Sequence, residues 1–389
     1  MRIASGGHGR EPADVRKTSQ RLADDREIIY YDSAAVGLRQ AKDLRDIGSV
    51  AVSSELRRDP LLGMWVMYAS HRQDRTYLPA ARDCPLCPST DDHLTEVPEH
   101  DYEVVVFENR FPALKAPAPE TVRAETVRAE QPVGALVDCT GASLLAERAG
   151  AGRCEVVCYT ADHNAAFHEL TPSRIDLVLE ALIDRTRELG AREDVEQVFC
   201  FENRGQEIGV TQPHPHGQIY AYPFIAPVTE RALTMVAAYR QNCGRNLFDD
   251  VLDAERADGS RTVLATDHWT AFVPHAARWP YELHCYPNDR VPDLPALSGP
   301  ARSELPEVLH DIFGRFAGLF DKPAPYIAGW HQAPARTGRE DFALHLELFT
   351  LRRANDKLKF LAGSESGMGA FANDIVPEAA AARLRALAV

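Results

Sequence analysis

Strand-like segments follow one another through the first half of this chain, and most of them have no helix between them. Segments rich in Val, Phe and Tyr, each ended by turn residues, occupy positions 65–68, 102–107, 154–159 and 195–201. Parallel strands need a long crossover, usually a helix, whereas antiparallel strands can be joined by short turns. The order of the segments therefore favours an α+β fold with antiparallel sheets over a doubly wound parallel sheet.

The clearest helical segment runs from Pro172 to Gly190. Thr171 suits the capping position before it, Pro172 suits the first helical position, and Gly190 suits its end. After Pro227 the pattern begins again in a similar style, which predicts a second α+β domain. Its expected helices lie near 229–241, near 307–320 and from Pro377, and its expected strands lie near 262–265, 270–274, 282–286 and 342–351.

The domain boundaries follow from interruptions in this pattern. Residues 1 to about 25 are polar, Gly-rich and aperiodic, so we expect a mobile tail there. The region 115–152 contains several prolines and a tandem Glu-Thr-Val-Arg-Ala, which is typical of a surface insertion. We expect an N-terminal catalytic domain over 26–227 and a C-terminal domain over 228–389.

Charge and hydropathy exclude several classes of function. The formal net charge is −14, which argues against nucleic-acid or anionic-membrane partners, since these need a surplus of Lys and Arg. No apolar run approaches the roughly 18 residues of a membrane span, and the first 50 residues contain no secretory core. We therefore expect a cytoplasmic protein whose 8 cysteines are mainly reduced thiols.

The segment His214-Pro-His216-Gly-Gln218 is the most informative for function. If it is extended, alternate side chains share one face, about 6 to 7 Å apart along the strand. A neutral imidazole is a competent nucleophile toward phosphorus when its other nitrogen donates to a carbonyl. A glutamine can donate a hydrogen bond to a phosphoryl oxygen but supplies no proton. The pattern therefore favours transfer between phosphates over hydrolysis. The alternative interpretation of this segment is a Pro-rich turn whose histidines are only solvated.

Cys84 and Cys87 have the spacing of half a tetrahedral zinc site. A redox pair is the competing interpretation, although no thioredoxin-like context surrounds these cysteines. Candidates for the other ligands are His163 and one of the paired histidines. If His214 is a ligand, the metal would hold the strand that carries His216.

Other polar residues could complete a site. Basic groups meet a phosphate only if they surround His216, and are otherwise solvated surface charges; the candidates are Arg72, Arg75, Arg204 and Lys359. In the second domain, His345 and Glu347 share a strand face and, with His331, match a metal-ligand set. A polar strand face without a metal is the alternative.

Together these residues resemble the galactose-1-phosphate uridylyltransferase family, within the histidine-triad superfamily. The resemblance runs from about Lys17 to the C-terminus, interrupted around 115–152. Besides the His-Pro-His-Gly-Gln signature, it rests on Asp258-Gly-Ser-Arg-Thr, Ala277-Arg-Trp-Pro and Gly329-Trp-His-Gln-Ala-Pro. It implies two histidine-triad-like domains with half-barrel antiparallel sheets and flanking helices.

The resemblance implies transfer of UMP from UDP-glucose to galactose 1-phosphate, giving UDP-galactose and glucose 1-phosphate. The cycle would be ping-pong through a uridylyl-His216, with Gln218 on a phosphoryl oxygen. Near the phosphates it implies Arg72, Arg75, Asn203 and Thr211; near the uridine, Leu86, Phe107 and Asn109; and near the hexose, Lys359, Phe360 and Glu365. In a homodimer, these last residues would reach the partner's site.

The resemblance also implies two metal sites. Zinc would be bound by Cys84, Cys87, His163 and His214. A second metal, iron or zinc, would be bound by His331, His345 and Glu347, with Glu230 replacing a usual glutamate whose position falls at Ala232.

Two other functions compete with this one. A nucleotide-sugar or dinucleoside-polyphosphate phosphorylase would use the same His216 but would take inorganic phosphate as the acceptor. A nucleotide-sugar sensor without turnover is disfavoured, because a binding site has no need of an unhindered imidazole beside the phosphate.

Overall fold

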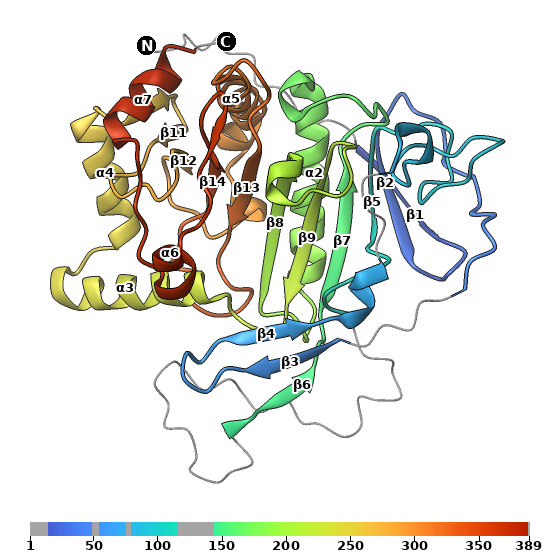
Figure 1. The fold of residues 1–389 in the computed structure, drawn as a ribbon, viewed down its shortest axis with the longest axis horizontal. Coiled ribbons are helices and arrows are strands. Elements are labelled where there is room, and N and C mark those ends of the chain that lie inside the picture. The colour runs from blue at the N-terminus through green and yellow to red at the C-terminus, as the bar shows by residue number, and fades with distance from the viewer. Residues whose placement is uncertain (1–14, 49–53, 75–78, 116–143, 388–389) are drawn as a thin grey trace.

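A computed structural model describes residues 15–48, 54–74, 79–115 and 144–387. Its centre is one open antiparallel sheet, which runs across the molecule from right to left in Figure 1. The strands, in spatial order, are β1 (Val15–Arg21), β2 (Glu27–Ser33), β5 (Val104–Glu108), β7 (Arg153–Cys158), β9 (His216–Tyr222), β8 (Gln197–Arg204), β13 (Tyr326–His331), β14 (His345–Thr350), β12 (Tyr281–Pro287), β11 (Trp269–Phe272) and β10 (Thr262–Ala265). The α+β class with antiparallel strands is confirmed.

The two halves of the chain contribute neighbouring parts of this one sheet. Strand β8 from the first half pairs with β13 from the second, with Phe201 opposite Gly329 and Glu202 opposite Ala328. Backbone hydrogen bonds therefore continue from one half into the other, and side chains on one face form rows across the join. The division at residue 227 stays a prediction, and helix α3 (Pro227–Cys243) begins there.

Part of the expected tail is ordered sheet. Strand β1 pairs with β2 along its whole length, from Val15 opposite Ser33 to Arg21 opposite Glu27. The expectation of a mobile tail is therefore wrong for 15–21; its polar side chains alternate between half-buried and exposed, as an edge strand allows. Residues 1–14 lie outside the described residues.

A smaller sheet lies across one end of the main sheet (Figure 1). It consists of β4 (Trp65–Tyr68), β3 (Glu55–Arg58) and β6 (Glu147–Ala149), in that order. Strand β6 belongs to the expected insertion at 115–152, of which 116–143 lie outside the described residues. A short hairpin of β15 (Arg352–Ala354) and β16 (Lys357–Leu358) follows the main sheet.

Helices α2 (Pro172–Gly190) and α5 (Gly299–Ala317) cover one face of the main sheet and share its largest core. Helix α2 has its predicted start, since the Thr171 hydroxyl accepts from the Arg174 amide. Helix α5 begins earlier than expected, at a Ser298 cap, and runs through Pro306. Neither these helices nor any other in the described part of the chain is long and apolar enough to cross a membrane.

The opposite face of the C-terminal half is packed by α4 (Leu247–Asp258), which the sequence pattern did not suggest. Asn246 caps its start and Gly259, at a positive φ of 68°, ends it. Leu252 on this helix packs against Phe272 and Tyr286. Helices α6 (Gly363–Met368) and α7 (Pro377–Arg385) follow near the C-terminus, α7 where the sequence predicts it.

A buried ion pair joins α2 to the sheet. Nε and Nη2 of Arg185 donate to the Glu155 carboxylate on β7, at 2.9 and 2.8 Å. Arg153 donates to the same carboxylate at 2.6 Å. Burial alone would raise the pKa of Glu155, but the two guanidinium groups hold it below its ordinary value. This pair helps to fix the position of helix α2 on the sheet.

Arg185→Met should lower the free energy of unfolding by about 3 kcal/mol, because it removes the chief partner of a buried carboxylate. Arg192→Met is the matched control, since its pair with Asp194 is about one-third exposed and should contribute at most about 1 kcal/mol. Urea denaturation of both variants measures the difference. Equal losses in the two variants would show that the buried pair has no special role.

Candidate active site

His216 and Gln218 project from β9 on the sheet face opposite α2. His216 lies opposite Cys158 of β7, and Gln218 lies opposite Val156 of β7 and Phe201 of β8. Paired residues in an antiparallel ladder share a face, so these side chains form one polar patch beside the aromatic row of β8. The expected shared face of His216 and Gln218 is therefore present.

The ring of His216 is held in one tautomer. Its Nδ1 lies 2.7 Å from the carbonyl oxygen of His214 and donates to it. The Nε2 of the neutral ring then carries a free lone pair. Burial lowers the pKa of His216 below its ordinary value, which favours this neutral form. This is the arrangement that a nucleophilic imidazole requires.

His216 opens on a pocket of about 130 Å³. The pocket is formed between the end of β8 and the segment that leads into β9, and its lining includes Asn203, Arg204, Gly205 and Gln212. Arg204 donates to the carbonyl oxygens of Pro213 and Ala165, so its guanidinium holds the wall of the pocket. Thr211 lies in the same segment, half-buried.

Glu202, which the sequence pattern did not single out, also lines this pocket. Its carboxylate is buried and accepts a hydrogen bond from the Tyr326 hydroxyl at 2.8 Å. Burial raises the pKa of Glu202 to about 7. The sequence signal for Glu202 was one acidic residue within a strand rich in apolar residues. Only the pairing of β8 with β13 shows that its carboxylate is enclosed.

The four residues expected to bind zinc lie together. The ligand atoms of Cys84, Cys87, His163 and His214 lie within 4.8 Å of one another. The Cys87 sulfur is 3.3 Å from Nδ1 of His163 and 3.5 Å from Nδ1 of His214. A tetrahedral zinc with ordinary bond lengths separates sulfur and nitrogen ligands by about 3.6 Å, so the residues fit the ion.

The donor set also fits zinc chemically. Nε2 of His214 lies 2.9 Å from the Thr160 carbonyl and 2.7 Å from the Tyr102 hydroxyl, which leaves Nδ1 free as a ligand. Burial lowers the pKa of His214 to about 4, so this imidazole is neutral. Cys84 and Cys87 are free thiols, and two imidazoles beside them favour a metal site over a redox pair.

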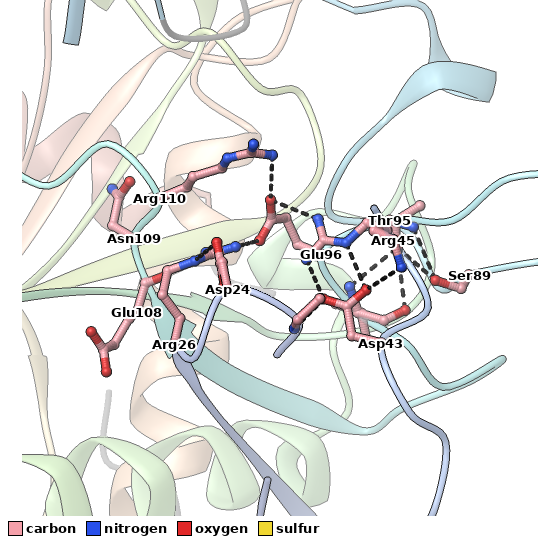
Figure 2. Close-up of polar contacts among 12 residues, drawn as sticks. Asp24, Arg26, Asp43, Arg45, Ser89, Thr95, Glu96, Glu108, Asn109 and Arg110 are labelled. Carbon is pink, nitrogen blue, oxygen red and sulfur yellow. Dashed lines mark hydrogen bonds and ion pairs between the residues drawn. The ribbon is translucent and has the colours of Figure 1, made fainter. Parts of the chain in front are cut away.

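A network of ion pairs holds the loop that carries the two cysteines (Figure 2). At its centre is Glu96, which pairs with Arg26 at 2.5 Å and Arg45 at 2.9 Å, with Arg110 at 3.9 Å. The Glu96 amide donates to the carbonyl of Pro85, between the two cysteines. The loop is therefore tied to both the N-terminal segment and the end of β5.

Five further residues were expected near the uridine or the phosphates. Leu86 and Phe107 are buried beside Cys84, and the side chain of Asn109 accepts from the Phe111 amide. Arg72 donates to the Tyr220 hydroxyl on the face of β9 that carries Gln218. Arg75 lies outside the described residues.

Lys359 and Glu365, expected near the hexose, are paired with each other at 2.6 Å. Phe360 between them in sequence is 72% exposed. None of the three is among the residues that line the His216 pocket. Within one chain, the structure does not bring them to the nucleophile.

The second expected metal cluster forms only in part. His331, His345 and Glu347 offer ligand atoms within 4.8 Å of one another. Glu230 on α3 is not a member of this group among the described residues; instead, Glu282 and His284 of β12 gather at Glu347. Alternation in β12 puts these two residues on one face, but only the pairing of β12 with β14 places them beside Glu347.

Known proteins of one family match this chain over both of its halves. Models of the family Galactose-1-phosphate uridyl transferase match residues 42–226 (N-terminal domain) and 232–389 (C-terminal domain). A galactose-1-phosphate uridylyltransferase of Streptomyces lividans is 45% identical over 388 residues, covering 96% of this chain and 98% of that protein. One of Thermotoga maritima is 36% identical over 335 residues, covering 85% and 98%. A solved structure titled as that of a uridylyltransferase has a TM-score of 0.71 at 27% identity and covers 86% of this chain and 98% of its own.

Glu202 should make stability depend on pH. Its folded pKa of about 7 lies above the ordinary value of 4.5, so the folded state loses stability as pH rises from 4.5 through 7. Relative to Glu202→Gln, the wild-type free energy of unfolding should fall by about 3 kcal/mol over this range. Glu193→Gln, at an exposed acid, is the control and should follow the wild type. Parallel profiles for wild type and Glu202→Gln would contradict this assignment.

Proposed function

Because the chain belongs to the galactose-1-phosphate uridylyltransferase family, we propose that it moves a uridylyl group from UDP-glucose to galactose 1-phosphate. The products are UDP-galactose and glucose 1-phosphate. The observation that carries this proposal is the bond from His216 Nδ1 to the His214 carbonyl, which leaves Nε2 unprotonated at the pocket. A nucleotidyltransferase that works through an imidazole needs this tautomer.

In the first step, the Nε2 lone pair of His216 attacks the α-phosphorus of UDP-glucose. The bond from that phosphorus to the bridging oxygen breaks, and its electron pair leaves with glucose 1-phosphate. The leaving group is a phosphate, so it departs without protonation, and Gln218 donates a hydrogen bond to a non-bridging oxygen. The ring, now bonded at Nε2, carries positive charge that the His214 carbonyl stabilises at Nδ1.

In the second step, a phosphate oxygen of galactose 1-phosphate attacks the uridylyl phosphorus. The bond to Nε2 breaks, its electrons return to the ring, and His216 is regenerated in its starting tautomer. The bonds made and broken in the two steps are of the same kind, so little net driving force is needed. The protein's task is to position the groups and to stabilise charge at the phosphorus.

We assign a structural zinc to Cys84, Cys87, His163 and His214. When bound, the ion would supply a fixed anchor for these four side chains rather than chemistry on the substrate. Its ligand His214 also provides the carbonyl that holds the His216 ring. The donor geometry and the network around Glu96 support this role.

The substrate contacts are assigned by the same proposal. The phosphates would meet Arg72, Arg75, Asn203 and Thr211, the uridine would meet Leu86, Phe107 and Asn109, and the hexose would meet Lys359, Phe360 and Glu365. The last three do not line the pocket of their own chain. The proposal includes a homodimer in which they serve the partner's site. The cysteines of the described residues are free and most of them are buried, which fits a reducing compartment such as the cytoplasm.

Replacing the nucleophile is the direct test of function. His216→Gly should lower turnover by on the order of 10⁴-fold or more, since no other group can carry the uridylyl intermediate. UDP-galactose formation is measured from UDP-glucose and galactose 1-phosphate, with circular dichroism to confirm folding. His275→Gly, at an exposed histidine, should retain wild-type turnover. Near wild-type rates in His216→Gly would refute the mechanism.

The acceptor distinguishes transferase from phosphorylase. Wild-type protein with UDP-glucose receives galactose 1-phosphate in one arm and inorganic phosphate in the other. The proposal requires UDP-galactose in the first arm and no UDP in the second. Rapid UDP formation with phosphate would identify a phosphorylase, and no reaction in either arm would favour a binding protein.

Removing one thiolate tests the zinc anchor. Cys87→Ser should lose one equivalent of zinc per chain and destabilise the fold by several kcal/mol, because metal binding contributes to folding. Elemental analysis and thermal unfolding measure both effects. Cys243→Ser, at an exposed thiol, is the control. Retention of the full zinc content in Cys87→Ser would contradict the assignment.

A further inference from the structure

One wall of the His216 pocket is a loop rather than a strand. The chain leaves β8 at Arg204, passes through a short 3-10 helix at Gln206–Ile208 and enters β9 at His216. We call residues 205–213 the pocket loop, and five of them line the pocket: Gly205, Gln206, Val210, Gln212 and Pro213. The Gly209 amide donates to the Gln206 carbonyl at 2.9 Å, within the loop itself. Such a bond shapes the loop but does not fix it against the sheet.

The pocket loop begins pressed against the C-terminal half of the chain. Gly205 has a φ of 106°, in the region that favours glycine. A Cβ at this position would lie 2.7 Å from the Cβ of Pro325, which directly precedes β13. The close approach fixes the first residue of the loop. The rest of the wall, as far as Gln212, depends on further contacts.

An ion pair ties the middle of the pocket loop to the same half. Nη2 of Arg352, on β15, donates to Oε1 of Glu207 at 2.7 Å. The Glu207 side chain is 34% exposed and the Arg352 side chain 8% exposed. The pair is therefore partly shielded from water, and its attraction is stronger than that of a fully exposed pair. It joins two residues that are 145 positions apart in the sequence.

Arg352 is itself a rigid support. Its Nη1 donates to the carbonyl oxygen of Asn355 at 3.0 Å, and its guanidinium lies 5.9 Å from the centre of the Phe320 ring. Its Nε is buried and has no hydrogen-bond partner among the described residues. Within that part of the chain, Glu207 is the carboxylate that compensates this buried charge. The arginine therefore holds Glu207, and through it the pocket loop, at a fixed place.

The position of this loop matters for the chemistry at His216. Its wall and the imidazole face the same pocket, so the wall limits where a phosphoryl group can lie. Transfer needs the reacting atoms about 3 to 3.5 Å apart, and a misplacement of about 1 Å can cost on the order of 100-fold in rate. The bond from His216 to the His214 carbonyl fixes only the nucleophile. The other partner of the reaction must be positioned by the walls.

We infer that Glu207 and Arg352 are positioning residues for uridylyl transfer, because their ion pair holds the pocket loop against the C-terminal half. Neither residue is among those that line the pocket, so both act through the loop rather than on the substrate. The inference rests on the proposed function. The order of the loop can also be measured in the protein without substrate, which separates the two.

Hydrogen exchange followed by peptide mass spectrometry measures the order of the loop. Glu207→Gln and Arg352→Gln should each speed exchange of the amides of residues 206–212 by about 10-fold, because a lost contact makes local opening easier. Peptides of α2 should exchange as in wild type, which shows that the fold is intact. Arg353→Gln is the matched control, since Arg353 lies on the same hairpin and pairs with Asp374 at the surface. It should leave exchange of the loop unchanged.

The rate of uridylylation at saturating UDP-glucose tests the catalytic part. Each single variant should form the adduct about 10-fold more slowly than wild type. The double variant should be no slower than either single one, since the two residues act as a unit. A normal adduct in wild type, with unchanged rate and loop exchange in Glu207→Gln, would overturn this inference alone, and so would additive losses in the double variant. No adduct in wild type would refute the proposed function and this inference together.

Discussion

One hydrogen bond, from Nδ1 of His216 to the carbonyl of His214, connects the two functions of the His-Pro-His segment. The side chain of His214 faces the thiols, while its main chain fixes the tautomer of the next histidine. A strand that shifted by one residue would turn His216 to the face of α2 and remove its lone pair from the pocket. The stability of this register therefore decides whether the site exists.

Several features outside the site maintain that register. Gly217 is required because a side chain there would collide with the Tyr159 hydroxyl, at 2.2 Å, on the face toward α2. The Glu155–Arg185 pair fixes α2 on the neighbouring strand, and the Glu96 network fixes the cysteine loop on the other face. The strand that carries the nucleophile is thus held from both faces of the sheet.

Features fixed by short-range spacing were predicted from the sequence, and those fixed by distant pairing were not. The bounds of α2, the shared face of His216 and Gln218, and the cysteine pair all follow from local spacing. The enclosure of Glu202 and the approach of His284 to Glu347 depend on strands more than 60 residues apart. The early start of α5 was missed because Pro306, normally a helix breaker, lies inside it.

In the proposed cycle, the imidazole of His216 becomes bonded to the nucleotide's phosphorus. Peptide mass spectrometry of wild-type protein, quenched after exposure to UDP-glucose without acceptor, detects this bond. One uridylyl group is expected on the peptide that contains His216, and it should be lost when galactose 1-phosphate is added before the quench. A uridylyl group on another residue, or turnover with no adduct on any peptide, would contradict this cycle.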